Sequence, residues 1–478
     1  MAKFFSCFLL LPLTFSAVFS QVDSLPGKKL SLSQCIELAL KNNPDIKRSA
    51  IQTQISRVNY RQSKADLLPR VDGNYSQGMN FGRSIDPYTN SYIDQKNSAA
   101  LGGFSGSLPL FNGFALYNGI RRNGLNYKAA QMDEQQAKDD LTLNVVLAYL
   151  DVLSAEELLS QTIQSREVSQ KRLQQVEILN KEGAVDPRSY HDIKAEFSGS
   201  QLNYVNASNT LQNAKLNLSQ LLNIPYSQTI AVESLNSGVE LIASNITPQQ
   251  VYNDALASLA VVKAADFRTE SADADIRIRR ANYFPSISLQ GGLNSNYSST
   301  AAKDIFINAI EVESPNFVEV NGTRYPVKVQ QQNFKSEKIA YTDQFKNNRY
   351  SYFNVGLNIP IFNNFRTRNT VSIAKLNKKD AEIQAESVRI KLQQLTEQAY
   401  YNMNFSKDAY LALTDQVSSL EESFRTAEVK FNAGAINSVD YLIAKNSLDN
   451  ARLDLIRSRY NFILRKQIVE YYRGNRSF

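Results

Sequence analysis

The 478-residue sequence contains no tryptophan, one histidine and two cysteines. His191 stands alone in a predicted helical turn, so neither a Ser-His nor a Cys-His catalytic pair can be assembled around it. No group of histidine, cysteine and carboxylate residues has the spacing of a metal site, and no glycine-rich phosphate-binding motif is present. The sequence therefore predicts that the protein is not an enzyme and has no cofactor or metal.

Long apolar runs are also lacking, apart from one at the start of the chain. Residues 4–19 are apolar, and Val18 and Ser20 occupy the −3 and −1 positions of a cleavage site before Gln21. This pattern predicts a signal peptide over residues 1–20. A membrane anchor is the alternative, which the shortness of the run disfavours.

The remaining absences concern the exported chain. Cys7 leaves with the signal peptide and Cys35 then has no partner, so no internal disulfide is expected. The net charge is +7, or +6 once Lys3 leaves with the signal peptide, but the basic residues are spread through predicted helices that also carry aspartate and glutamate, so we expect no nucleic-acid partner. Because no further apolar run is long enough for a spanning helix, the chain can enter a membrane only as β-strands.

What is present is an internal repeat. Matching residues lie 216 positions apart early in each half and 251 apart later, so the β-rich segment of the second half is 35 residues longer. We predict two structural repeats, residues 21–246 and 247–478. The matched pairs include Ser31 and Thr247, Pro69 and Pro285, Pro109 and Pro360, and Gly183 and Gly434.

Each half has two stretches of about 11 residues in which apolar and polar side chains alternate. Strands of this length and period suit a bilayer crossing, with lipid on one side and a polar interior on the other. A soluble, half-buried sheet gives the same alternation, so the pattern alone leaves both open. Strands are predicted at residues 70–81, 97–109, 286–297 and 349–359.

Helical patterns fill most of the rest. Residues 114–182 and 365–433 each contain 69 residues without proline and carry apolar residues at heptad spacing, which requires partner helices. Such a helix spans about 100 Å. Gly183 and Gly434 end these two helices, so each half contains a long antiparallel helical hairpin. Further helices are predicted at 31–68, 187–223, 247–284 and 438–472, with a linker at 225–246 and an extended loop at 298–348, where Asn321-Gly322 indicates a hairpin turn.

The junction between strand and long helix occurs twice, as PLFNGF at residues 109–114 and PIFNNF at 360–365. We expect the proline to end strand pairing, because it has no N–H to donate, and the first asparagine to cap the helix. The predicted junction residues are Pro69, Pro109, Asn112, Pro285, Pro360 and Asn363.

Four amphipathic strands cannot close a barrel, and hydrocarbon does not tolerate open sheet edges. Two, three or four copies of the chain would supply eight, twelve or sixteen strands. The same symmetry would bring the long hairpins together as a helical tube. This geometry favours a membrane-spanning conduit over a soluble sheet.

Six segments of the sequence carry a resemblance to a known family: LSLSQCIELALKNNPDI, LLPRVDGNYS, PLFNGF, LNLSQLLNIP, PIFNNF and FNAGAINSVDYLIAKNSLDNA. They resemble the TolC-type outer-membrane efflux family, and the resemblance runs from about Leu30 to Tyr472. It implies an α+β membrane protein in which four transmembrane strands per chain complete a 12-stranded trimeric β-barrel, continued by a long periplasmic α-helical coiled-coil barrel. It places the barrel in the outer membrane of a Gram-negative bacterium, with the helices in the periplasm.

The resemblance also implies a function and partners. The chain would be the exit duct of a tripartite efflux or type I secretion system, passively conducting substrates from an inner-membrane pump and a periplasmic adaptor protein to the outside. Its partners would be two further copies in a homotrimer, the adaptor, the pump and outer-membrane lipid. The alternative is a non-transporting periplasmic coiled-coil structural or adaptor protein, which explains the helices but not the four alternating runs.

By the same resemblance, the hairpin ends at Gly183 and Gly434 contact the adaptor and form an entrance that is closed at rest. The family narrows this entrance with acidic residues after the second turn glycine, and Asp440 matches that position. A second aspartate commonly follows three residues later, where this chain has Ile443.

The first half has Ser189 and Asp192 at the equivalent offsets, so Asp192 and Asp440 together could form two rings of carboxylates that attract cations. The alternative role for Asp440 is helix capping. If Asn437 is the N-cap, Asp440 is the third helical residue, where an acid favours the helix dipole. Both roles remain open from the sequence.

Overall fold

The computed structural model describes residues 29–85, 90, 92–94, 96–226, 231–234 and 246–475. The predicted signal peptide and most of the predicted linker at 225–246 lie outside these residues. The chain divides into two compact units, each built from several segments. The first contains residues up to 53, 130–265 and from 384 onward, and the second contains residues 54–129 and 266–383.

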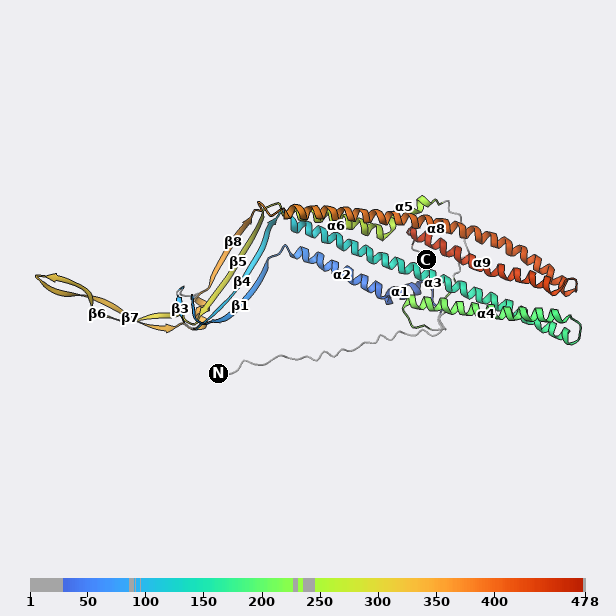
Figure 1. The fold of residues 1–478 in the computed structure, drawn as a ribbon, viewed down its shortest axis with the longest axis horizontal. Coiled ribbons are helices and arrows are strands. Elements are labelled where there is room, and N and C mark those ends of the chain that lie inside the picture. The colour runs from blue at the N-terminus through green and yellow to red at the C-terminus, as the bar shows by residue number, and fades with distance from the viewer. Residues whose placement is uncertain are drawn as a thin grey trace. The chain divides into compact units, whose positions relative to one another are not determined.

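Helices make up most of the described chain (Figure 1). Among them, none combines the length and the apolar character needed to cross a membrane. In chain order they are α1 (Leu32–Asn42), α2 (Pro44–Ala65), α3 (Ala115–Lys181), α4 (Pro187–Leu222), α5 (Pro248–Ser258), α6 (Ala260–Ala281), α7 (Tyr341–Asn347), α8 (Arg366–Asn432) and α9 (Ser438–Tyr472).

The single helices predicted at 31–68 and 247–284 are each two helices, so that prediction is corrected. Pro44 forces Asn43 into an extended conformation (ψ 124°), and the Asn43 side chain caps α2 by accepting from the Asp45 N–H at 2.8 Å. The second break falls at the equivalent position, Leu259 (ψ 135°), without a proline. There the leucine side chain is buried among apolar neighbours from α5 and α6.

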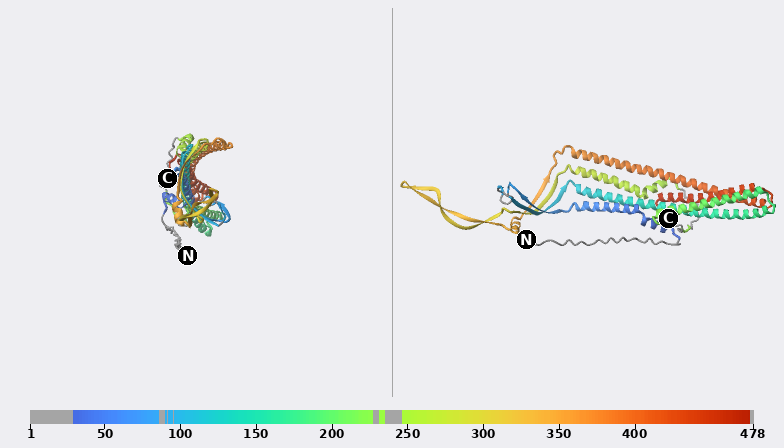
Figure 2. Two further views of the ribbon diagram at one scale, coloured as in Figure 1. Left: turned by 90° about the vertical axis from the view of Figure 1, so that its left-hand side faces the viewer. Right: turned by 60° about the horizontal axis from the view of Figure 1, so that its bottom comes forward.

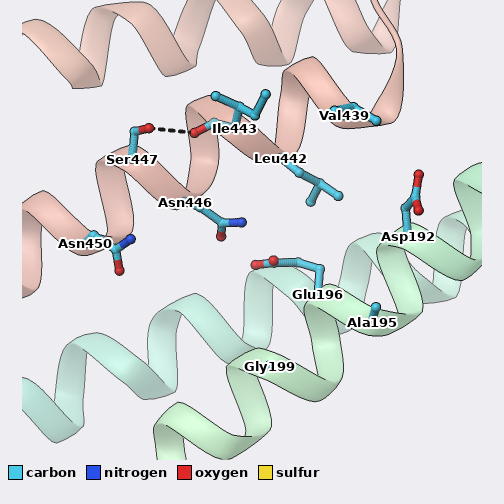
Figure 3. A pocket seen from close by; sticks show the side chains of 10 residues that line it. All are labelled: Asp192, Ala195, Glu196, Gly199, Val439, Leu442, Ile443, Asn446, Ser447 and Asn450. Carbon is cyan, nitrogen blue, oxygen red and sulfur yellow. Dashed lines mark hydrogen bonds between the residues drawn. The ribbon is translucent and has the colours of Figure 1, made fainter.

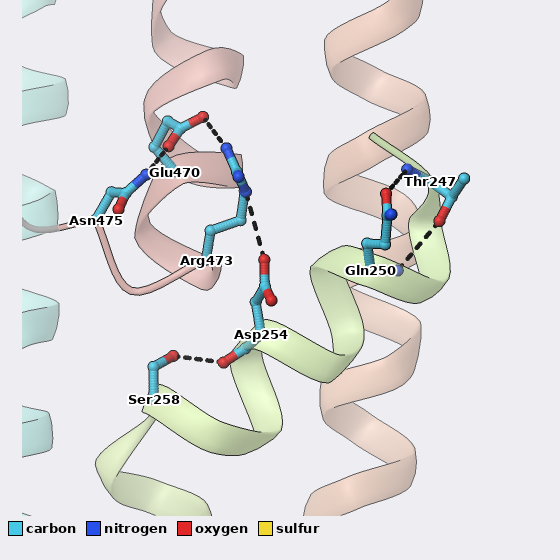
Figure 4. Close-up of polar contacts among 7 residues, drawn as sticks. All are labelled: Thr247, Gln250, Asp254, Ser258, Glu470, Arg473 and Asn475. Carbon is cyan, nitrogen blue, oxygen red and sulfur yellow. Dashed lines mark hydrogen bonds and ion pairs between the residues drawn. The ribbon is translucent and has the colours of Figure 1, made fainter. Parts of the chain in front are cut away.

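Both repeats begin with a capping box, as the sequence indicates. Thr247 Oγ1 accepts from the Gln250 N–H at 3.2 Å, while Gln250 Oε1 accepts from the Thr247 N–H at 2.9 Å (Figure 4). Ser31 and Gln34 make the same pair of bonds. Arg473, just after α9, lies 3.5 Å from Asp254 of α5, so this ion pair ties the start of the second repeat to the chain's last helix.

The chain forms two helical hairpins, α3–α4 and α8–α9 (Figure 2). The turns of both hairpins lie in the first unit. The Gly183 N–H donates to the Asn180 carbonyl at 3.1 Å, and the Ala184 N–H donates to the Leu179 carbonyl at 2.8 Å. The same two bonds recur at Gly434, at 3.0 and 2.8 Å, and both glycines have φ of +70°. The repeat in the sequence is therefore a repeat in turn geometry.

The largest apolar core of the first unit lies around the heptad stripe of α3. Val145, Tyr149 and Val152 are fully buried there against Leu218 of α4 and Cys35 of α1. The Tyr149 hydroxyl is close to two backbone carbonyls, those of Leu30 and Glu233, at 3.1 and 2.7 Å. Some of the partner helices that the heptad stripe of α3 requires, α1 and α4, therefore lie in the same chain.

A four-stranded antiparallel sheet lies in the second unit, with strand order β1-β4-β5-β8 (Figure 1). The two repeats meet where β4 pairs with β5, and β1 and β8 are the two edges. The strands are β1 (Arg70–Asn80), β4 (Asn97–Asn112), β5 (Ser286–Ser298) and β8 (Tyr350–Asn358).

The register of this sheet separates apolar from polar side chains. Leu108, Leu289 and Val355 lie opposite one another across three strands, and so on one face. The adjacent row, Ser107, Gln290 and Asn354, lies on the other face. Exposed members of the apolar face include Val71, Tyr75, Met79, Phe104, Leu293, Phe353, Val355 and Leu357.

The structure changes the role assigned to the junction prolines. β4 continues past Pro109 to Asn112 through a bulge and pairs there with β5, so Pro109 does not end strand pairing. β1 pairs with β4 only as far as Ser107. No residue of β1 therefore lies opposite Pro109, where a backbone N–H donor would be missing. Pro360 does follow the last paired residue of β8, Asn358.

The two junctions share an unusual backbone. Gly113 and Phe114 have φ of +63° and +65°, and the equivalent Asn364 and Phe365 have φ of +54° and +59°. In each copy the two phenylalanines pack edge to face, with ring centroids 5.4 and 5.5 Å apart. At each junction, two consecutive residues in the left-handed conformation therefore connect the strand to the long helix.

Capping by the junction asparagines is found at one copy only. Asn112 Oδ1 accepts from the Leu116 N–H at 3.4 Å. Asn363 instead donates from its side-chain amide to the Thr367 hydroxyl, so its predicted cap is corrected. Pro69 and Pro285 immediately precede β1 and β5.

The predicted extended loop at 298–348 is mostly ordered structure. β6 (Ala302–Val320) and β7 (Thr323–Lys338) form a long hairpin around Asn321-Gly322, and α7 follows. A second, short hairpin, β2 (Arg83–Ile85) with β3 (Tyr92–Asp94), joins β1 to β4. Sequence reasoning located the Asn-Gly turn but not the length of β6 and β7.

Candidate functional site

The candidate site lies at the ends of the two helical hairpins, where α4 and α9 begin. Asp186 caps α4 by accepting from the Arg188 N–H at 3.2 Å. Asn437 caps α9 by accepting from the Asp440 N–H at 2.9 Å. Both caps follow within three residues of a turn glycine, so the side chains of the first helical turns are held close to the hairpin ends.

Two of the predicted entrance residues meet here. The Ser189 and Ser438 hydroxyl oxygens are 3.3 Å apart, and the Ser438 hydroxyl donates to Asp192 Oδ2 at 3.1 Å. Ser438 is buried, and Arg188 lies 3.9 Å from the same carboxylate oxygen. This chain of polar groups joins α4 to α9 at the hairpin ends. Sequence reasoning missed Ser438, whose only signal is its place beside the N-cap.

Asp440 lies outside this cluster. Its backbone N–H is bonded to Asn437, its side chain is exposed, and it is the acidic residue of the first turn of α9. The capping geometry that the sequence left open is therefore present. Ile443, at the family's second acidic position, is also exposed. Within one chain, then, Ser189 and Asp192 are brought together and Asp440 is not.

An open groove of about 650 Å³ separates α4 from α9 next to this cluster (Figure 3). Asp192 and Glu196 line it from α4, while Leu442, Ile443 and Asn446 line it from α9. One side is thus acidic and the other mixed apolar and amide. The groove places carboxylates beside the hairpin ends rather than in a closed pocket.

Lys445 forms a buried ionic centre deeper between the hairpins. Its Nζ lies 2.6 Å from Asp449 Oδ2, 2.9 Å from Glu196 Oε1 and 3.4 Å from Ser165 Oγ, joining α9, α4 and α3. Burial works against the charged amine, but Asp449 and Glu196 outweigh it and raise the pKa of Lys445 above its ordinary value. The ammonium form therefore persists throughout the physiological range.

A second link between the hairpins is made by Arg172 of α3. Its guanidinium lies 5.1 and 5.0 Å from the ring centroids of Phe431 and Tyr441, and Nη1 donates to Asn432 Oδ1 at 2.9 Å. Phe431 and Tyr441 also stack on each other at 4.7 Å. Polar, ionic and aromatic contacts thus hold the two hairpins together near their ends.

Catalytic or metal chemistry has no evident location in the described part of the chain. No three histidine, cysteine or carboxylate residues there are grouped to hold a metal ion. His191 is exposed and packs edge-on against Tyr190, at 5.2 Å between ring centroids. Burial raises the pKa of the Cys35 thiol to about 12, which leaves it protonated and unreactive.

The sequence and the fold match known transport proteins. The family model described as "Outer membrane efflux protein" matches residues 35–223 and 251–467. Outer membrane protein TolC of Escherichia coli K12 is 24% identical over 469 residues, covering 95% of this chain and 84% of that protein. Cation efflux system protein CusC of E. coli O6:H1 is 26% identical over 443 residues, covering 89% and 82%. The crystal structure of the Campylobacter jejuni CmeC outer membrane channel superimposes with a TM-score of 0.71 at 17% identity, covering 93% of this chain and 85% of that one.

Proposed function

This chain belongs to the family of outer membrane efflux proteins and is an outer-membrane efflux channel, and we propose that it is the exit duct of a tripartite export system. In this role it conducts substrates passively from an inner-membrane pump and a periplasmic adaptor protein to the outside. Its location is the outer membrane of a Gram-negative bacterium. Family membership assigns it to transport channels rather than to enzymes or to non-transporting coiled-coil proteins.

The observation that carries the proposal is the four-stranded sheet with open edges at β1 and β8. One of its faces exposes large apolar side chains, as a surface in contact with lipid would. Hydrocarbon requires every backbone N–H and C=O to be bonded, so the edges need partners. Pairing β1 of one copy with β8 of the next closes the sheet, and a homotrimer gives twelve strands.

The helical hairpins would then line a periplasmic tube, with the turns at Gly183 and Gly434 at its entrance and in contact with the adaptor. In each copy Asp192 lies beside Ser438, and Asp440 projects from the first turn of α9. Three copies would arrange these carboxylates as rings around the entrance. Such rings favour cations over anions in a narrow pore.

Recording from purified protein in planar lipid bilayers tests both parts of the proposal. We expect discrete conductance steps with cation preference, and we expect Asp192→Ala with Asp440→Ala to reduce that preference. Asp454→Ala, an exposed aspartate further along α9, is the matched control and should leave selectivity unchanged.

The outcomes separate the two claims. If no conductance is recorded from correctly assembled protein, the duct proposal fails. If conductance is present but the double variant keeps the selectivity of the unmodified protein, the carboxylate rings are wrong and the duct proposal stands.

A further inference from the structure

The long hairpin β6–β7 has two different faces in its outer part, residues 310–329, which we call the distal hairpin. On one face Glu319 lies opposite Arg324, and Glu313 lies opposite Lys328. Ion pairs join Arg324 to Glu319 at 3.5 Å and Lys328 to Glu311 at 3.6 Å. This face carries the charged side chains of the distal hairpin. It also carries Phe317, which lies opposite Pro326 and whose ring centroid is 4.2 Å from the Arg324 guanidinium.

The other face is apolar. Val318 lies directly opposite Tyr325, and Val312 lies opposite Val329, so these side chains share one side of the hairpin. Val318 is 54% exposed and Tyr325 is 56% exposed, so none of the residues that the structure describes covers them. The face comprises Ile310, Val312, Val318, Val320, Tyr325, Val327 and Val329.

An isolated two-stranded hairpin is marginally stable in water, so an apolar face of this size requires a cover. The base of the hairpin is firmly held. The Ile339 N–H donates to the Ala301 carbonyl at 3.3 Å, and the buried Gln344 side chain bonds the Ser298 N–H at 2.9 Å and its carbonyl at 3.0 Å. These hydrogen bonds therefore hold the base of the hairpin against the end of β5.

We propose that the distal hairpins of the three copies pack their apolar faces against one another beyond the extracellular end of the barrel. This inference rests on the proposed trimer. The hairpin lies in the connection from β5 to β8, and β8 is the edge that pairs with the next copy, so the new contact continues that interface. Three identical apolar faces, brought around one axis, cover one another and leave the charged faces in water.

The charge of the distal hairpin disfavours a lipid cover. Its 20 residues contain three glutamates against one arginine and one lysine, so it has no excess of positive charge toward an anionic membrane surface. The neighbouring copies, by contrast, present the same β-branched and aromatic side chains that this face presents. A second and third copy are therefore the occupants that the chemistry supports.

Single cysteines at adjacent positions test the contact. Val318→Cys places a thiol on the apolar face and Glu319→Cys places one on the charged face, while Cys35 is fully buried and serves as background in both. In the assembled protein we expect Val318→Cys to react several-fold more slowly with a water-soluble maleimide. We also expect it to form a disulfide between copies on oxidation, which Glu319→Cys does not form.

Equal labelling of the two thiols would show that the face is bare and overturn the inference. Slow labelling of Val318→Cys without a disulfide between copies would show a different cover, lipid or another protein, and would also overturn it. The mass of the detergent-solubilised complex is measured on the same samples. A trimer without the hairpin contact refutes only this inference, whereas a complex that is not a trimer refutes the proposed function with it.

Discussion

At the scale of residues, Lys445 is the charged group that joins three helices near the hairpin ends. It is 5% exposed, and its two carboxylate partners come from α4 and α9. Removing the cation would leave Glu196 and Asp449 close together with no counter-ion. A buried ion pair broken in this way costs several kcal/mol, mostly from the charge left behind.

We therefore expect Lys445→Met to lower the free energy of unfolding by about 3 kcal/mol per chain. The measurement is the shift in the midpoint and slope of guanidinium unfolding of the isolated complex. Lys181→Met is the matched control, because Lys181 pairs with Glu177 at 3.2 Å on an exposed helix face and should change stability by less than about 0.5 kcal/mol. Equal effects of the two substitutions would contradict the account.

The pH dependence of this contribution follows from the raised pKa of Lys445. A raised folded-state pKa gives stability that is fully present below the ordinary lysine value, about 10.4, and is lost as pH rises through the folded-state value. The destabilisation caused by Lys445→Met should therefore be present at both pH 6 and pH 9. A difference that disappears between these pH values would contradict the assignment of the charge to Lys445.

Residue-scale prediction from sequence succeeded where the signal is local. The N-cap at Asn437 and the position of Asp440 in the following turn follow from neighbouring residues alone. The Lys445 centre does not, because Ser165 and Glu196 are about 280 and 249 residues away in the chain and only the packing of hairpins brings them together.

At the scale of elements, the hairpin turns depend on glycines with positive φ. Gly434 has φ of +70° and open space where a Cβ would stand, so a side chain there meets only the backbone penalty of the left-handed region. We expect Gly434→Ala to lower the free energy of unfolding by about 1 kcal/mol. Differential scanning calorimetry of the isolated complex measures the effect as a lower unfolding temperature.

Gly199 provides the control for this substitution. It lies inside α4, is exposed, and also has open space at the Cβ position. Gly199→Ala should raise stability by up to about 1 kcal/mol, because alanine has the higher helix propensity. Opposite signs for the two substitutions are expected, and a stabilising Gly434→Ala would refute the turn geometry.

Element boundaries show which signals the sequence carries. Pro44 explains the break after α1, but nothing in the local sequence announces the break at Leu259, which depends on burial of that leucine. Likewise, Pro109 predicts the end of a strand. In the structure β4 continues past Pro109 through a bulge, because it still pairs with β5 there. Tertiary partners decided both cases.

At the scale of the whole molecule, the two faces of the sheet have different surroundings. Val355 is 55% exposed near the middle of β8 on the apolar face, and its neighbour Asn354 lies on the polar face. A lysine on the lipid side of a membrane strand costs about 2–4 kcal/mol at mid-bilayer, whereas one in a polar interior is tolerated.

Val355→Lys should therefore reduce the amount of heat-modifiable complex in the outer membrane fraction, while Asn354→Lys should leave it near the level of the unmodified protein. The measurement is gel migration of that fraction with and without heating. The reverse order of the two variants would place the polar face toward lipid and contradict the membrane orientation.

The alternation of residues along each strand predicted which side chains share a face, since period two is a local property. It could not decide between lipid and a soluble core, because both cover an apolar face. The repeat, the open edges of the sheet and the family match decide that question together.

In the proposed channel, three chains close one barrel through the edges β1 and β8. Light scattering of the detergent-solubilised complex, corrected for bound detergent, measures how many chains the complex contains. We expect a protein mass of three mature chains. A mass of one, two or four chains would contradict the twelve-stranded channel.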